Sequence, residues 1–185
     1  MTTSTSSSTP PTQRVAPPEQ GDEAAQLRGY VDFLRDSLRM KAEGLTAEQL
    51  HTRHEPSALT LGGLLKHLAF VEHWWFSCVL HGRDFAEPWA SVDWDADEDW
   101  DYNSAAADTP AELFALFDAT IAESDRITDE ALATPEGLDT IAVRHPADED
   151  PVNLRYILLH MIEEHGRHAG HADLIRESID GSTGE

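Results

Sequence analysis

The chain is poor in several kinds of residue, and each shortage argues against a class of protein. With a single cysteine, Cys78, it can form no internal disulfide, which fits a reducing compartment such as the cytoplasm. It has only 13 Lys and Arg residues against 35 Asp and Glu residues, a net charge of −22. Nucleic-acid phosphates and anionic membrane surfaces would repel such a chain. It also lacks the run of about 20 apolar residues that a membrane-spanning helix needs. We therefore expect neither nucleic acid nor a membrane as a partner, and a cytoplasmic location.

Composition divides the sequence into a tail and one domain. Residues 1–22 are rich in Ser, Thr and Pro and contain almost nothing to bury, so we expect a disordered tail. This stretch has no apolar segment of the kind found in secretory signals. Residues 23–182 have a length and an apolar content that suit a single domain with one core.

Four long amphipathic helices are predicted within that domain, because apolar residues recur at spacings of three and four. Capping residues and glycines mark most of their ends, notably Thr109-Pro-Ala-Glu112, Asn153 and Gly181. The helices are expected at about 23–44, 60–80, 109–132 and 153–181, with a short helix after Thr46. Apart from a weak stretch at 140–143, nothing resembles a strand. The fold class is therefore all-α, as a four-helix bundle.

A long segment without helical periodicity, residues 84–108, joins the second and third helices. Six of the nine residues 93–101 are acidic, and Trp89, Trp94 and Trp100 lie in the same segment. Loops of this length are usually functional or disordered, and the aromatic residues favour a packed loop. Two interpretations stay open: the tryptophans line a pocket, or they only pack while the acids face solvent.

Histidines gather on one face of the last helix. At 100° per residue, Glu164 lies about 40° from His160, and His171 lies about 20° from it. His168 falls one turn after Glu164, so this pair can bind one metal together. His165 points away from Glu164, and we expect it to be exposed.

A three-ligand zinc site would need one more ligand, from another helix. His67, on the apolar stripe of the second helix, is the better candidate; His73 is expected to face away from it. His171 is an alternative third ligand. Cys78 is too far along the helix to bind and should be a small buried residue. The competing interpretation is that these histidines are hydrogen-bonded core residues and that Glu164 and His168 form a surface pair.

Two stretches carry a resemblance to a known family. They are Leu64-Leu-Lys-His67-Leu, with Glu72 and Trp75 after it, and the run from Leu158 through Glu164 and His168 to Ile179-Asp-Gly. They resemble the DinB-like superfamily of metal-binding bundles, in particular the actinobacterial branch of mycothiol S-transferases. The N-terminal domain of mycothiol-dependent maleylpyruvate isomerase belongs to the same branch. The resemblance spans residues 26–184 and implies an up-down-down-up bundle with a long loop between helices 2 and 3.

The resemblance also implies a site and an activity. Its metal ligands map onto His67, Glu164 and His168, with zinc expected and iron or nickel as alternatives. The implied reaction is transfer of a low-molecular-weight thiol such as mycothiol to small electrophiles, with a metal-bound thiolate as nucleophile. A homodimer is also expected. The alternatives are a non-catalytic metal-binding stress or interaction module, and a metal-dependent hydrolase with Glu164 as base.

Three further residues are candidates for supporting roles. His160 and His171 could each accept or donate a hydrogen bond beside the metal ligands, as neighbours of such ligands commonly do. Arg155, at the start of the last helix, is the candidate for anchoring a substrate carboxylate during catalysis. A surface ion pair is the alternative for Arg155, because it lies on the opposite side of the helix from Glu164.

Overall fold

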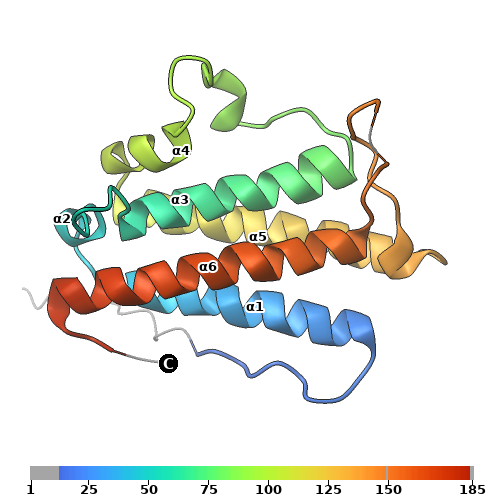
Figure 1. Ribbon diagram of the computed structural model, residues 1–185, viewed down its shortest axis with the longest axis horizontal. Coiled ribbons are helices and arrows are strands. Elements are labelled where there is room, and N and C mark those ends of the chain that lie inside the picture. The colour runs from blue at the N-terminus through green and yellow to red at the C-terminus, as the bar shows by residue number, and fades with distance from the viewer. Residues whose placement is uncertain (1–12, 149, 184–185) are drawn as a thin grey trace, which may run out of the picture.

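The computed structural model describes residues 13–148 and 150–183. Within this part the chain forms helices and a single β-bridge, between Ile141 and Asn153. The all-α prediction is confirmed. The helices are α1 (Glu23–Ala42), α2 (Ala47–Leu50), α3 (Leu61–Glu72) with a π-helical continuation (His73–Leu80), α4 (Trp100–Asn103), α5 (Pro110–Leu132) and α6 (Leu154–Asp180) (Figure 1).

The four long helices lie side by side with their axes roughly aligned. α1 packs against α6 and α3 against α5, while α3 also contacts α1 and α6. In Figure 1, α1 and α6 run in one direction and α3 and α5 in the other. As a result α3 and α6, which carry the candidate ligands, are antiparallel neighbours. None of the described helices combines the length and the low charge needed to cross a bilayer.

Local sequence signals set the helix ends. The Thr109 hydroxyl accepts a hydrogen bond from the Glu112 N–H, and the Glu112 carboxylate accepts one from the Thr109 N–H. The Asn153 side chain accepts the N–H of Tyr156 and begins α6, and Gly181 ends α6 with a φ of 76°. A left-handed residue of this kind is the usual way to satisfy the last carbonyls of a helix.

The second predicted helix has its expected extent, but its last eight residues wind as a π-helix. In this winding each N–H bonds five residues back, so residues five apart become neighbours. Cys78 Sγ accordingly lies 3.6 Å from His73 Nε2. Cys78 is fully buried and burial raises the pKa of its thiol, which makes it an unreactive core residue as expected.

The 84–108 segment folds onto the outer side of α3. It contains α4 and two 3₁₀ turns, Trp89–Ser91 and Ser104–Ala107. Trp89 is buried and stacks on His73, with ring centroids 4.7 Å apart. His73 Nε2 accepts the N–H of Ala86, and burial lowers the pKa of His73, which keeps that nitrogen free to accept. The prediction of a packed loop is therefore correct, and this loop covers His73 although His73 lies outside the apolar stripe.

Only part of the expected tail can be located. Residues 1–12 lie outside the described residues. Residues 13–22 form neither helix nor strand, but they pack along the side of α1. Arg14 donates a hydrogen bond to the Ser37 hydroxyl and lies over the Phe33 ring. Pro18 packs so closely on Gly29 that a β-carbon there would come within 2.5 Å of the proline ring. The expected boundary between tail and domain stays a prediction.

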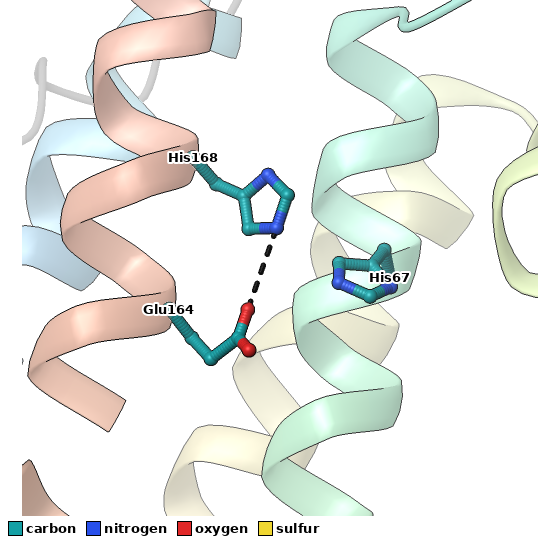
Figure 2. A group of neighbouring side chains, drawn as sticks. All are labelled: His67, Glu164 and His168. Atoms are coloured by element: carbon teal, nitrogen blue, oxygen red, sulfur yellow. Dashed lines mark ion pairs between the residues drawn. The ribbon is translucent and has the colours of Figure 1, made fainter. Parts of the chain in front are cut away.

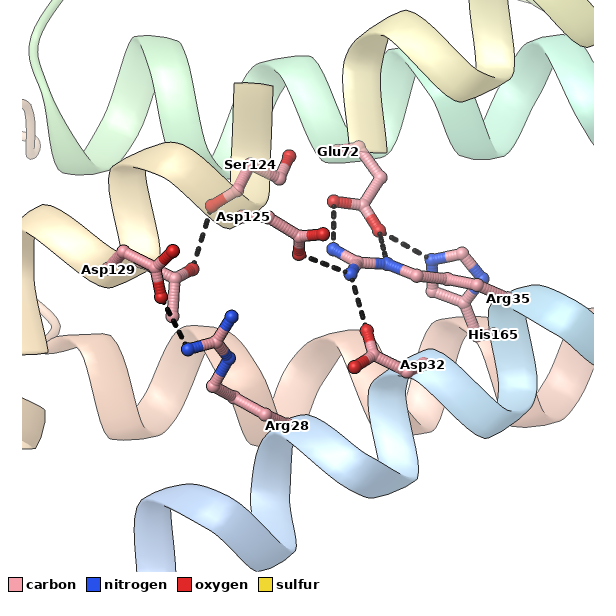
Figure 3. Close-up of polar contacts among 9 residues, drawn as sticks. Arg28, Asp32, Arg35, Glu72, Ser124, Asp125, Asp129 and His165 are labelled. Carbon is pink, nitrogen blue, oxygen red and sulfur yellow. Dashed lines mark hydrogen bonds and ion pairs between the residues drawn. The ribbon is translucent and has the colours of Figure 1, made fainter. Parts of the chain in front are cut away.

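A buried polar cluster joins all four long helices at the centre of the bundle (Figure 3). Arg35 of α1 donates from Nε and Nη2 to the two carboxylate oxygens of Glu72 on α3, at 2.7 and 2.8 Å. His165 Nε2 of α6 lies 2.9 Å from Glu72 Oε1, and Arg35 Nη1 reaches Asp125 of α5 at 2.8 Å. We call Arg35, Glu72 and His165 the central triad. Each of the three is almost completely buried.

His165 corrects a sequence-based expectation. Its direction, away from Glu164, was predicted to lead to solvent, but its side chain is fully buried. α6 packs against both α1 and α3, so the side of α6 next to the ligand-bearing face is turned into the bundle. Helical periodicity alone does not reveal which side of a polar-lined helix faces the interior.

The central triad should make the protein sensitive to acid. Burial alone would raise the pKa of Glu72, but the Arg35 charge and the hydrogen bonds from His165 and Arg35 lower it from 4.5 to about 2. Unfolding therefore brings proton uptake between these values, and stability present above pH 4.5 is lost toward pH 2. The loss from this group should be about 3 kcal/mol. Urea unfolding should show the stability gap between wild type and Glu72→Gln narrowing over this range; a constant gap would contradict the assignment.

Candidate metal centre

Three candidate ligands face one another across the α3–α6 interface (Figure 2). His67 comes from α3, while Glu164 and His168 come from successive turns of α6. Each offers one ligand atom, and these atoms all lie within 4.8 Å of one another. Glu164 Oε2 is 3.5 Å from His168 Nε2, and the two imidazole centroids are 4.9 Å apart. The structure thus brings together residues that are about 100 positions apart in sequence.

His67 is oriented by two residues from the 84–108 segment. Its Nδ1 lies 2.7 Å from a carboxylate oxygen of Asp101, which is itself buried. Its ring stacks on Tyr102, with centroids 4.2 Å apart and planes 18° from parallel. When Nδ1–H donates to the carboxylate, Nε2 keeps its lone pair, which is the arrangement usual for metal-binding histidines.

His168 is electrostatically prepared to bind a cation. Burial and the neighbouring His67 and His171 lower the pKa of His168 to about 3. At neutral pH its imidazole is therefore unprotonated, as a metal ligand must be. His171 Nδ1 lies 3.4 Å from His168 Nδ1, so His171 lies directly beside the candidate ligand group.

The donor set fits a divalent cation. Two imidazole nitrogens and one carboxylate are a common protein ligand set for catalytic zinc, which keeps a further position open. The side chains of His67 and Glu164 retain 17% and 19% exposure, so the ligand group is reachable from outside. Its two histidines are supplied unprotonated or with a fixed orientation, which removes part of the cost of assembling the site.

His160 extends the polar cluster along α6. Its Nε2 lies 3.6 Å from Glu164 Oε1, so Glu164 stands between His160 and His168 with one oxygen toward each. His160, Glu163 and Glu164 form a second group whose ligand atoms lie close enough for a cation. The His160 ring packs edge-on against Trp75, centroids 4.7 Å apart.

Arg155 and the tryptophans lie elsewhere. Arg155 lies in the first turn of α6, where it pairs with Glu23 and Asp139. This matches the surface ion pair considered as its alternative role. Trp89 and Trp94 pack against Phe70 on the outer side of α3. Trp100 lies under the ammonium group of Lys66. None of these has a ring contact with the three candidate ligands among the described residues.

Sequence reasoning missed Asp101 and Tyr102. Both belong to the 84–108 segment, in which the predicted pocket-lining residues were Trp89, Trp94 and Trp100. Within six acids in nine residues, no spacing rule distinguishes the one that reaches His67. The contact depends on how α4 lies across the first turns of α3. There Tyr102 is so close to Gly63 that a β-carbon at this glycine would lie 3.4 Å from it.

The fold and the candidate site together define a class of protein: an all-α chain in which the antiparallel helices α3 and α6 present two histidines and a glutamate to each other. The family model described as mycothiol S-transferase matches residues 26–181, and the chain belongs to that DinB-like family. No curated protein matches the chain.

Asp101 should matter for metal binding without being a ligand. In Asp101→Asn the side chain keeps its shape but no longer holds a negative charge against His67 Nδ1. We expect metal affinity to fall about 10- to 100-fold, as is typical when the partner of a ligating histidine is changed. Competition with a chromophoric chelator measures this, and Asp99→Asn, an exposed acid two residues away, serves as the control. Equal affinities for wild type and Asp101→Asn would refute the role.

Proposed function

We propose that the protein is a metal-dependent thiol transferase that joins mycothiol, or a similar low-molecular-weight thiol, to small electrophiles. The observation that carries the proposal is the convergence of His67, Glu164 and His168 inside the region matched by the family model. A histidine bound to a buried carboxylate, next to an unprotonated histidine, has little value for a plain helical core, since buried polar groups lower stability unless fully partnered.

The three ligands would hold the cation through His67 Nε2, a Glu164 oxygen and His168 Nε2. A cation there would favour the deprotonated form of a thiol, whose usual pKa of about 8.5 leaves little of it nucleophilic at neutral pH. Zinc suits the donor set best as a redox-inert cation, and iron or nickel would also be accepted by two imidazoles and a carboxylate.

The surrounding residues would orient the reactants. Burial and the charges of Asp101 and Glu164 raise the pKa of the Tyr102 hydroxyl well above its usual value, so it remains a hydrogen-bond donor at neutral pH. In the reaction the thiol loses its proton to solvent and its sulfur forms a bond to the electrophilic carbon. The leaving group departs with the electrons of the bond that breaks. Tyr102, stacked on His67, shields one side of this centre from water.

A cavity next to Tyr102 is the best place for the rest of the thiol. It has a volume of about 300 Å³, and Tyr102 forms part of its wall. Its polar lining mixes donors and acceptors, which suits a ligand rich in hydroxyl groups, as the sugar part of mycothiol is. Thr60, one of the lining residues, precedes His67 by seven residues, or about 10 Å along the helix. The lining residues are His51, Arg53, Ala58, Leu59, Thr60, Asp99, Tyr102, Asn103 and Ala106.

Arg53 distinguishes this cavity from the others. It is exposed and has no ion pair or hydrogen bond with another described residue. Each of the other lysines and arginines forms a hydrogen bond or an ion pair with another described residue. In a chain with so many acids, an unpaired guanidinium at a cavity is available for a ligand.

Two other functions make different predictions. A non-catalytic metal-binding module would bind the cation but turn over no thiol, and a hydrolase using Glu164 as base would work without one. The proposal also includes a homodimer, as in the wider superfamily, and action in the cytoplasm, where small thiols stay reduced.

The decisive test measures metal content and thiol turnover together. Protein without a histidine tag should contain close to one metal ion per chain, and mycothiol should add to a chromogenic electrophile such as a chlorodinitrobenzene. His67→Ala should lose both, because it removes a ligand, while its circular dichroism stays helical. Metal without thiol-dependent turnover would favour the binding module, and turnover without thiol the hydrolase.

Arg53→Ala tests the thiol cavity. Loss of one charged hydrogen bond should raise KM for mycothiol about 10-fold or more. KM for N-acetylcysteine, which has the thiol but not the sugar part, and the metal content should not change. Arg14→Ala is the matched control, since Arg14 also lacks a carboxylate partner but lies against α1. An equal KM increase for both thiols would place Arg53 outside the cavity's binding role.

A further inference from the structure

We propose that the central triad of Arg35, Glu72 and His165 positions the metal ligands, by fixing how α6 is rotated and spaced against α3. This inference rests on the proposed metal centre and adds residues that are not themselves ligands. His165 immediately follows Glu164, and Glu72 follows His67 by five residues. The Glu72–His165 contact therefore joins the two ligand-bearing helices within about one and a half turns of the ligands on each.

The contact defines a rotation as well as a distance. Along α6, His165 is offset by 100° from Glu164 and by about 60° from His168. Holding His165 Nε2 2.9 Å from Glu72 turns Glu164 and His168 toward the groove where His67 lies. A rotation of α6 by about 20° would move side-chain atoms about 6 Å from its axis by about 2 Å. Metal–ligand distances tolerate only about 0.2 Å, so small rotations would dismantle the ligand set.

Arg35 gives this contact its direction. The guanidinium binds both oxygens of Glu72, which fixes the carboxylate plane, and leaves Oε1 also facing His165. The same guanidinium is held by Asp32 and Asp125, at 2.9 and 2.8 Å. Figure 3 shows the carboxylate of Glu72 facing both the guanidinium of Arg35 and the imidazole of His165. Glu72 therefore has no free rotation that would let α6 slide.

We expect the bundle to fold without these charges. Its core already contains apolar side chains from all four long helices, among them Leu38, Leu64, Phe117, Ile157 and Met161. Replacing a buried ionic group by apolar residues of similar size is often neutral or stabilising, so stability alone does not account for a buried ionic cluster. Such clusters are best known for fixing register and orientation, and here the register concerns the two helices that share a metal site.

The test separates positioning from folding. The apolar variant Arg35→Met/Glu72→Met/His165→Leu removes the whole triad without leaving a fully buried charge, because Asp32 and Asp125, which lose Arg35 as a partner, have side chains 55% and 41% exposed. We expect a folded protein whose zinc affinity falls at least 10-fold. Its cobalt-loaded form should show an altered visible spectrum, because the ligands no longer converge. Arg28→Gln, which breaks an exposed α1–α5 ion pair with Asp129, is the control and should change neither.

A matched pair at His165 tests the same idea with one change. Gln places an amide nitrogen near the position of Nε2, so His165→Gln should keep zinc affinity within a few-fold, whereas His165→Leu should lose it about as much as the triple variant does. This pair decides the matter if the triple variant does not fold. Folded variants without the triad that keep wild-type zinc affinity and cobalt spectrum would overturn the proposal. A wild type that binds no metal would instead overturn the metal centre itself.

Discussion

The arrangement of the four long helices depends on the carboxylate of Glu72, which is buried and binds side chains from two other helices. It is fully buried and would be intolerable alone, so it draws a guanidinium from α1 and an imidazole from α6, and through Arg35 also α5. Removing one partner of such a group typically costs about 3–5 kcal/mol, because a buried charge is left uncompensated. One residue of α3 thus constrains the position of every other long helix, which apolar packing by itself does less strictly.

The candidate site lies in the groove between α3 and α6, next to the interior contact between Glu72 and His165. His67 and Glu72 lie on the same helix, one facing the groove and the other the interior, and His165 and Glu164 repeat the arrangement on α6. The third contribution comes from α4, whose Asp101 and Tyr102 hold the His67 ring from outside. In the proposed arrangement, the candidate ligands are positioned from the interior by the central triad and from the surface by Asp101 and Tyr102.

The sequence predicted most of the fold and which residues form the candidate ligand group. The features that it predicted depend on one helix alone, and those that it missed depend on how segments pack together. Capping residues such as Thr109 and Asn153 act locally, so they could be located without knowing the fold. The one-turn spacing of Glu164 and His168 is likewise a property of a single helix. His165 was misjudged because its environment depends on which helices flank α6. Asp101 was missed because its contact with His67 is set by the path of an irregular segment. The π-helical winding after Glu72 has no recognisable signal in the sequence. It brings Cys78 next to His73, a contact that an α-helical projection would not suggest.

The uneven charge of the chain has a consequence for what can approach the site. The lysines and arginines other than Arg53 are engaged with neighbouring groups, so the excess of carboxylates dominates the field outside the molecule. Such a field raises the local concentration of cations and lowers that of anions, most strongly at low ionic strength. It favours capture of a divalent ion by the groove and the arrival of uncharged reactants. In the proposed reaction, electrophiles that carry a carboxylate or phosphate would be repelled by most of the surface but attracted by Arg53, so charge would discriminate among substrates before any contact is made.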